Sequence, residues 1–360
     1  MREFINGIQR YKHRLATVAL LFGFVVDIIT FRNLDLNYAL ILLSAHLFIV
    51  AITILILSIP FENKEGSFFT DVRSWLPVLQ HYSMGNLLSA FLILYSASGS
   101  LVASWPFLAL VVIAVIGNET LKLEKNRLPF QTSLFFLNLV LFMALLGPIV
   151  FSAISIATFL ISLIIAIFVF AVFRRLLWLV ARTAFHEHKW RINNGALAVL
   201  TLLVVLYFSN LMPPIPLTLK DVQFYYSVER VGAEYIARDE QRSFVESFFD
   251  VGGRTLFLHP GEAAYVYTAV FAPARLDTRV VHRWENFNEQ TGAWITKNVV
   301  DFPISGGRRG GYRGYSLTQS PQAGRWRISV ETTRGQIIGR SYVTIARPKE
   351  PVITETFQIQ

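Results

Sequence analysis

The chain has 360 residues, of which 53% are hydrophobic and 16% charged, and it contains no cysteine. This composition is too apolar for an ordinary soluble protein of that length, and the absence of thiols excludes disulfides, a cysteine nucleophile and cysteine-ligated zinc. The formal net charge of +9 does not require a nucleic-acid partner, because basic residues of the first half cluster at the ends of apolar runs, where they set membrane orientation.

Seven apolar runs in residues 1–212 predict a multi-pass membrane domain, an all-α bundle with about seven spans. A helix rising about 1.5 Å per residue needs some 20 residues to cross a hydrocarbon core of about 30 Å. The predicted spans are Leu15–Phe31, Tyr38–Pro60, Leu76–Ala97, Val102–Gly117, Phe130–Leu146, Ile149–Phe173 and Gly195–Met212. Asp27 interrupts the first run and no small-residue cleavage site follows it, so we interpret that run as a retained span. Gly147-Pro148 predicts a helix break.

Basic residues predict the orientation of these spans. With the N-terminus in the cytoplasm, the inner segments carry 14 of the 15 lysines and arginines before Pro213, and the outer loops carry only Arg32. Basic loops stay on the cytoplasmic side, so an odd number of spans places residues 213–360 outside the cytoplasm.

The last inner segment, Arg174–Arg191, has the pattern of a basic amphipathic helix at the interface. Its His186 and His188 are two residues apart and would diverge on a helix, so we expect no metal site there.

Two ionisable residues lie well inside predicted spans, Asp27 and His46. Such residues are costly in hydrocarbon and are therefore candidate functional residues. One interpretation is a proton relay between them. The alternative is that Asp27 reaches the outer headgroups while His46 forms a hydrogen bond inside the bundle. We expect Asn138 to join helices by hydrogen bonding.

Pro213, Pro214 and Pro216 end the last predicted helix. After them the sequence changes from long apolar runs to alternating apolar and polar residues. We expect a Pro-rich linker at 213–220, a β-sandwich of immunoglobulin-like architecture at 221–349 and a tail at 350–360. The predicted strands are two within Phe224–Ala237, then Thr255–His259, Ala263–Phe271, Thr278–Glu285, Ala293–Val299, Tyr312–Leu317, Gly324–Glu331 and Gln336–Ile345.

A glycine-rich basic segment is the clearest candidate binding site in the C-terminal half. It contains Arg308, Arg309, Tyr312, Arg313 and Tyr315. Glycines expose backbone N–H groups and arginines form paired hydrogen bonds, so the segment suits an anion such as a phosphate, sulfate or uronate. The alternative is a strand entry whose arginines pair with Asp301 and Glu331 and whose aromatic rings pack.

His282 and three tryptophans receive structural interpretations. His282 shares a strand face with Trp284, so we expect a packed, hydrogen-bonded imidazole rather than a general base. Trp284, Trp294 and Trp326 are interpreted as core residues.

The region from Thr255 to Ile345 resembles a bacterial C-terminal family of unknown function, DUF2914. The matching features are His282-Arg283-Trp284, Ile304–Arg308, Gly311-Tyr312-Arg313, Gly324 with Trp326, Glu331, Gly335-Gln336 and Gly339-Arg340. The resemblance implies a membrane or envelope protein and supplies no catalytic residue.

These observations predict a protein of the bacterial inner membrane with a cytoplasmic N-terminus and a periplasmic or extracellular β domain. We expect that domain to bind an anionic glycan, a lipid headgroup or an envelope protein. The alternative is a membrane enzyme or transporter that uses the helical bundle, with the β domain as a lid. No catalytic motif is present in the sequence, and we expect no cofactor, metal or nucleic-acid partner.

Overall fold

The computed structural model of the chain describes residues 36–60, 68–120, 127–232, 234–240, 254–273, 276–305, 310–348 and 352–359. It divides into two compact units. The helical unit comprises Met1–Tyr95, Pro106–Gly147 and Phe159–Val205, and the β-rich unit comprises Ser96–Trp105, Pro148–Thr158 and Leu206–Gln360. The predicted first span, with Asp27, lies outside the described residues.

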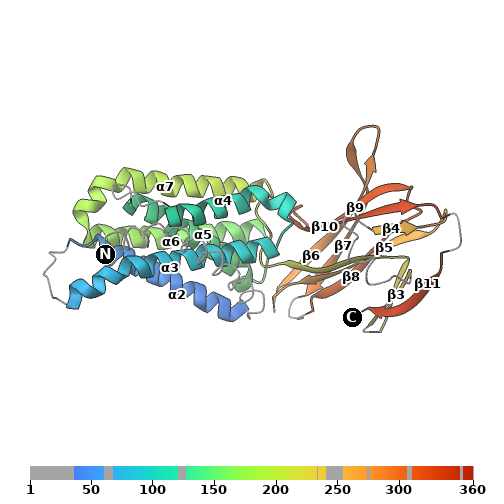
Figure 1. Cartoon of the computed structure of the whole chain (residues 1–360), viewed down its shortest axis with the longest axis horizontal. Helices are drawn as coiled ribbons and strands as arrows, with labels where there is room; N and C mark the ends of the chain where they lie inside the picture. The colour runs from blue at the N-terminus through green and yellow to red at the C-terminus, as the bar shows by residue number, and fades with distance from the viewer. Residues whose placement is uncertain are drawn as a thin grey trace, which may run out of the picture. The chain divides into compact units, whose positions relative to one another are not determined.

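Long helices lie side by side in the first part of the chain (Figure 1). They are α2 (Leu36–Ser58), α3 (Phe68–Ala97), α4 (Leu101–Thr120), α5 (Arg127–Val150), α6 (Ile156–Val180) and α7 (Arg182–Phe208). Of these described helices, five are long and apolar enough to cross a membrane, namely all except α3. The expectation of about seven spans is therefore not confirmed: α3, which contains Leu76–Ala97, lacks a sufficiently apolar stretch of that length.

Two predicted boundaries are wrong. Gly147-Pro148 does not break the helix, because α5 continues through Pro148 to Val150. A proline so near the end of a helix disturbs only its last turn. The segment Arg174–Arg191 is not a separate amphipathic helix: α6 and α7 meet at the buried Ala181, and each contributes one of its own ends.

Helix α5 forms the centre of the helical unit. In its most apolar stretch 72% of the helix is buried inside the structure, against 22–39% in the corresponding stretches of the other four candidate spans. Phenylalanines join it to α6: Phe135 lies 4.6 Å from Phe173, and Phe136 lies 4.5 Å from Phe170, between ring centroids. Gly195 of α7 lies so close to Ser133 of α5 that a Cβ there would clash.

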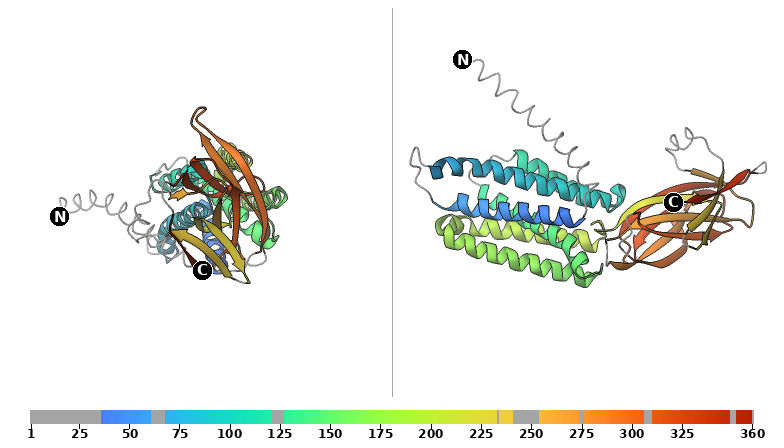
Figure 2. Two further views of the ribbon diagram at one scale, coloured as in Figure 1. Left: turned by 90° about the vertical axis from the view of Figure 1, so that its right-hand side faces the viewer. Right: turned by 90° about the horizontal axis from the view of Figure 1, so that it is seen from below.

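The β-rich unit contains three sheets. The strands are β1 (Thr218–Tyr225), β2 (Ser227–Val231), β3 (Glu234–Glu240), β4 (Arg254–Phe257), β5 (Ala263–Phe271), β6 (Asp277–Asn288), β7 (Ala293–Ser305), β8 (Tyr312–Gln319), β9 (Gly324–Thr332), β10 (Ile337–Ala346) and β11 (Thr354–Ile359). The sheet orders are β1-β5-β8, β4-β10-β9-β6-β7 and β11-β3-β2. The hairpin of β6 and β7 extends beyond the other strands (Figure 2).

Most predicted strands are confirmed, and β5 has the predicted bounds. The tail is different, because β11 pairs antiparallel with β3 along its whole length, from Thr354 with Glu240 to Ile359 with Tyr235. The predicted linker is also buried: Leu217 joins the core, and β1 begins at Thr218.

The first two sheets pack face to face. Alternate residues of β1, β5, β6, β9 and β10 fill the space between them, among them Phe224, Val266, Trp284, Trp326 and Val343. The side of the β1-β5-β8 sheet that faces this core is called its inner face. Its outer face packs against the small β11-β3-β2 sheet through tyrosines. The two faces of one thin sheet therefore have different roles.

Candidate functional site

The structure separates the residues of the predicted anion site. Arg308 and Arg309 lie outside the described residues. On β8, side chains alternate between the two faces of the sheet: Tyr312 packs against the core on the inner face, while Arg313 and Tyr315 belong to the outer face. The structure thus brings together Arg313 and Tyr315 but not Tyr312.

On the outer face, Arg313 lies beside a group of five tyrosines, including Tyr315, that we call the tyrosine cluster. Its members are Tyr225 of β1, Tyr235 of β3, Tyr265 and Tyr267 of β5, and Tyr315 of β8. The Tyr235 ring lies 5.5 Å from Tyr267 and 6.2 Å from Tyr315, and Tyr265 lies 6.3 Å from Tyr315. Sequence analysis missed this cluster because its members come from four predicted strands whose pairing was unknown. The one available signal was the spacing of Tyr265 and Tyr267, which are two residues apart and therefore lie on the same face of their strand.

Two polar groups of this face are left without partners. Among the described residues, the half-buried Arg313 guanidinium forms no ion pair or side-chain hydrogen bond. The hydroxyl of Tyr267, a residue with 1% exposure, also has no hydrogen-bond partner there. The main chain around them is fixed, since the Tyr235 hydroxyl donates to the Arg313 carbonyl oxygen at 2.9 Å. A buried polar group without a partner is costly, so a bound group would be favourable here.

Two tyrosines of the cluster, Tyr225 and Tyr267, remain protonated donors at neutral pH. Burial raises the pKa of Tyr225 to about 12, with a further contribution from the Asp221 carboxylate. Burial also raises the pKa of Tyr267, against the opposing effect of the Arg313 guanidinium. These hydroxyls can therefore donate hydrogen bonds to an anion.

The arginines of the five-stranded sheet are engaged differently. Arg327 binds Glu285 at 2.6 Å, Arg283 binds Glu331 at 3.1 Å, Arg279 binds Asp301 at 2.7 Å and Arg325 binds Glu289 at 3.1 Å. Asp301 and Glu331, which the alternative interpretation assigned to Arg308, Arg309 or Arg313, are thus paired with Arg279 and Arg283. Burial raises the pKa of Glu331, and Arg283 opposes this shift.

His282 is confirmed as a packed, hydrogen-bonded imidazole. It is fully buried, with Nε2 3.0 Å from Thr268 Oγ1 and Nδ1 2.9 Å from Ser316 Oγ. Trp284 donates to the same Ser316 oxygen at 3.0 Å. Trp284 and Trp326 are core residues as predicted. Trp294 is not, because it lies half-exposed on the opposite face, with the Arg327 guanidinium 4.5 Å from its ring.

The helical unit contains a buried polar cluster that the sequence analysis did not identify as a site. Gln80 of α3 is 2% exposed, and both of its amide atoms lack partners among the described residues. The same holds for Ser83 Oγ, one turn away, and for Asn138 Oδ1 of α5. Asn138 Nδ2 donates to Met84 Sδ at 3.2 Å, which confirms it as a link between helices.

His46, the other predicted intramembrane residue, lies on α2 with its ring 6.0 Å from Tyr82. Asp27 is outside the described residues, so the two are not brought together. Within the described part of the chain, no three His, Asp or Glu side chains are grouped as metal ligands.

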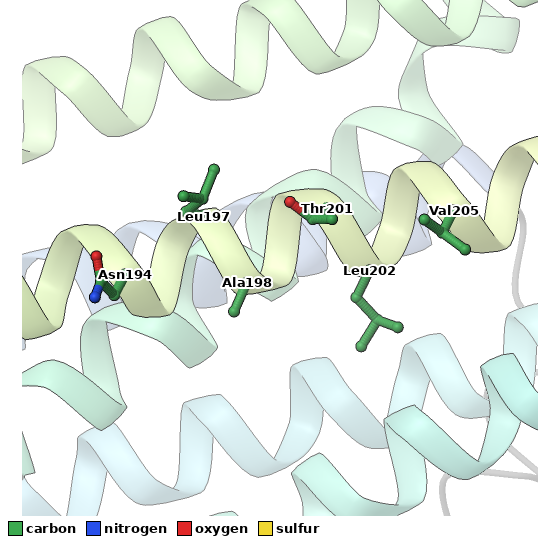
Figure 3. Close-up of a pocket in the computed structure, with 6 residues that line it drawn as sticks. All are labelled: Asn194, Leu197, Ala198, Thr201, Leu202 and Val205. Atoms are coloured by element: carbon green, nitrogen blue, oxygen red, sulfur yellow. The ribbon is translucent and has the colours of Figure 1, made fainter.

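A groove of about 520 Å³ runs along one face of α7 (Figure 3). Its lining residues are Asn194, Leu197, Ala198, Thr201, Leu202 and Val205. They recur every three to four residues, with adjacent pairs at 197/198 and 201/202, and are mostly apolar, as expected for one face of a helix. We assign it no binding role.

Comparison with known proteins gives one family match. Residues 277–345, from the start of β6 to β10, match a family described as "Protein of unknown function (DUF2914)", which confirms the resemblance. No curated protein matches the chain. Among solved structures, the Pseudomonas fluorescens alkylpurine DNA glycosylase AlkC bound to DNA containing an abasic site analog aligns at 11% identity over 84% of this chain and 97% of that chain. The TM-score of 0.20 is too low to carry an argument.

Proposed function

Since residues 277–345 belong to DUF2914, a family of unknown function, no activity comes with the family, and we propose from the site geometry that the β-rich unit binds an anionic ligand. The binding site is the outer face of the β1-β5-β8 sheet at Arg313, Tyr267 and Tyr315. The ligand is an anionic glycan, a lipid headgroup or an acidic patch of an envelope protein.

One observation carries this proposal: a half-buried guanidinium and a buried phenol hydroxyl, on neighbouring strands, both lack side-chain partners within the described part of the chain. Arginine binds phosphate and carboxylate through two parallel hydrogen bonds. The exposed ring of Tyr315, with 36% of its surface accessible, adds a flat surface for a sugar ring or a lipid glycerol. On the five-stranded sheet, by contrast, Arg279, Arg283, Arg325 and Arg327 are neutralised by carboxylates.

The proposal includes a location. Five apolar helices support insertion in a membrane, and the one-sided basic residues favour an N-terminus in the cytoplasm and a β-rich unit in the periplasm or outside the cell. About seven spans and an immunoglobulin-like topology remain part of the same proposal.

Binding to purified full-length protein in maltoside detergent tests the function. The probes are glycerol phosphate, glucuronate and inorganic phosphate, followed by thermal shift and calorimetric titration. We expect at least one probe to bind the wild type and to bind Arg313→Gln at least tenfold more weakly. Arg279→Gln is the matched control, because it removes a paired arginine from the other sheet; its affinity should equal that of the wild type. Equal affinity of Arg313→Gln and wild type for every probe that binds would contradict the proposal.

A second candidate function belongs to the helical unit. The partnerless amide of Gln80, with Ser83 and Asn138, favours a site for water or a small uncharged solute inside the bundle, since buried polar clusters are normally satisfied by protein or water. Radiolytic footprinting tests it: Met84, 1% exposed, should oxidise faster than Met212, which is 3% exposed, and Gln80→Leu should remove the difference. Equal protection of the two methionines would exclude bound water there.

A further inference from the structure

Two opposite charges flank one small residue at the centre of the proposed site. In the strand register, Ala269 of β5 is opposite Asp221 of β1 on one side and Arg313 of β8 on the other. Residues directly opposite one another share a face of the sheet. Asp221, Ala269 and Arg313 therefore form a row across the outer face, acid on one side and base on the other.

The two charges do not neutralise each other. Two strand spacings separate their Cα atoms by about 9.5 Å, and no ion pair joins these two described residues. Among the residues that the structure describes, the Asp221 carboxylate accepts one long hydrogen bond, from Gln223 Nε2 at 3.4 Å. Both side chains are half-buried. A half-buried acid and a half-buried base that are held apart are best satisfied by one molecule that carries both opposite charges.

Tyrosines surround this row. The Tyr267 hydroxyl, which is buried and has no hydrogen-bond partner among the described residues, comes from the same strand as Ala269. Burial is the main cause of the raised pKa of Tyr225 and of Tyr267, and the Asp221 carboxylate adds to both shifts. The Arg313 guanidinium opposes the shift of Tyr267, so both charges act on that hydroxyl. Tyrosine rings also attract cations over their faces, which favours an ammonium group near Asp221.

We propose that the site takes a zwitterionic ligand in which an ammonium and a phosphate are joined by a short linker, as in a phosphoethanolamine group. The phosphate binds Arg313 and accepts a hydrogen bond from Tyr267, and the ammonium binds Asp221 beside Tyr225. A two-carbon linker separates the charges enough to bridge Ala269. This inference rests on the proposed function, because it names the ligand of the same site.

The test compares the zwitterion with each of its halves. Full-length protein in maltoside detergent, stripped of lipid, is titrated with phosphoethanolamine, inorganic phosphate and ethanolamine. We expect phosphoethanolamine to bind at least tenfold more tightly than either half. Asp221→Asn should reduce its affinity to that of phosphate, and Arg313→Gln should abolish the binding of both. A short-chain phosphatidylethanolamine below its micellar concentration is the second arm: tighter binding than free phosphoethanolamine assigns the group to a lipid.

Asp221→Glu keeps the charge and should retain most of the affinity, which separates loss of charge from loss of fold. Asp301→Asn is the matched control for removal of an acid, because Asp301 is exposed and pairs with Arg279 on the other sheet. If phosphate binds as tightly as phosphoethanolamine, or if Asp221→Asn binds like the wild type, the zwitterion inference is wrong while the anion site stands. If Arg313→Gln also binds every probe like the wild type, the zwitterion inference and the anion site are both wrong. The same holds if none of the probes binds, glycerol phosphate and glucuronate included.

Discussion

His282 Nδ1 lies 2.9 Å from Ser316 Oγ, across the space between two sheets of the β-rich unit. The Ser316 oxygen already accepts a hydrogen bond from Trp284, so its own hydrogen is available for Nδ1. The other ring nitrogen, Nε2, then donates to Thr268 Oγ1 at 3.0 Å. This arrangement suits a neutral imidazole that carries its one ring proton on Nε2. Burial accordingly lowers the pKa of His282 to about 3.

Acid should weaken the β-rich unit through His282. In the unfolded chain a histidine has a pKa of about 6.5, so between that pH and about 3 the unfolded state binds one more proton. The contribution is fully present above pH 6.5 and falls by up to about 1.4 kcal/mol per pH unit below it. Hydrogen exchange of β6 and β8 peptides from pH 7 to pH 4, corrected for intrinsic rates, measures this slope. In His282→Gln the slope of the unfolding free energy against pH should be smaller by the equivalent of one proton. An unchanged slope would contradict the low pKa of His282.

Two arginines of the five-stranded sheet should differ greatly in their effect on stability. Arg327 covers Glu285, and their side chains are 16% and 9% exposed, whereas Arg279 and Asp301 are 50% and 52% exposed. Arg327→Ala leaves a buried carboxylate unpaired and should cost about 3 kcal/mol. Arg279→Ala removes a solvent-exposed surface pair and should change the free energy of unfolding far less. Denaturant unfolding followed by hydrogen exchange of β9 compares them, and equal losses would contradict the burial of Glu285.

Tyr267→Phe should stabilise the protein while weakening binding. It removes a buried hydroxyl that has no partner among the described residues, and such a change is neutral or favourable by up to about 1 kcal/mol in the ligand-free state. Loss of the same hydroxyl removes a donor from the bound anion. Melting temperature and affinity should therefore move in opposite directions. A clear loss of stability would show that the hydroxyl already has a partner. Tyr342→Phe, on the exposed face of β10, serves as the control.

Removal of β11 should expose the tyrosine cluster. This strand pairs with β3, Ile359 packs beside the cluster, and the Phe357 ring lies 6.0 Å from Tyr225. A chain that ends at residue 351 should lose hydrogen-exchange protection in β3 and gain accessibility at Tyr225, because β3 becomes an edge strand. Ile353→Ala is the control, since Ile353 is 81% exposed. Unchanged protection of β3 would contradict the pairing.

Sequence alternation predicted individual strands well but not their partners. In β9, Trp326 is buried and Arg325 exposed as expected, but Ser329 and Glu331, which the alternation places on the wet face, are buried as well. Periodicity assigns a residue to a face of its own strand only, so the meeting of Tyr235, Tyr267 and Tyr315 depended on pairings that no local pattern contains. The same limit explains Trp294, whose strand was predicted but whose face was not. Strand β11 was missed because its alternation is short and follows a proline.

For the helices, the sequence predicted which segments are helical but not which buried polar residues come together. Apolar length predicted the existence of α2, α4, α6 and α7, since burial in hydrocarbon is a property of composition. The bounds of α2 and α4 were close, whereas α6 lies seven residues later than predicted and α7 begins at Arg182 rather than Gly195. The break at Pro148 was wrong because a proline in the last turn of a helix costs little. The cluster of Gln80, Ser83 and Asn138 involves two helices, and only their packing brings these residues together.

The most direct test of the central claim is a ¹⁹F NMR titration of full-length protein that carries 3-fluorotyrosine at position 267. On addition of phosphoethanolamine, the account predicts a shifted resonance in the wild type and in Arg279→Gln, and no shift in Arg313→Gln. A resonance that stays in place while phosphoethanolamine or glycerol phosphate binds, or that shifts equally in Arg313→Gln, would contradict a binding site at Arg313 and Tyr267.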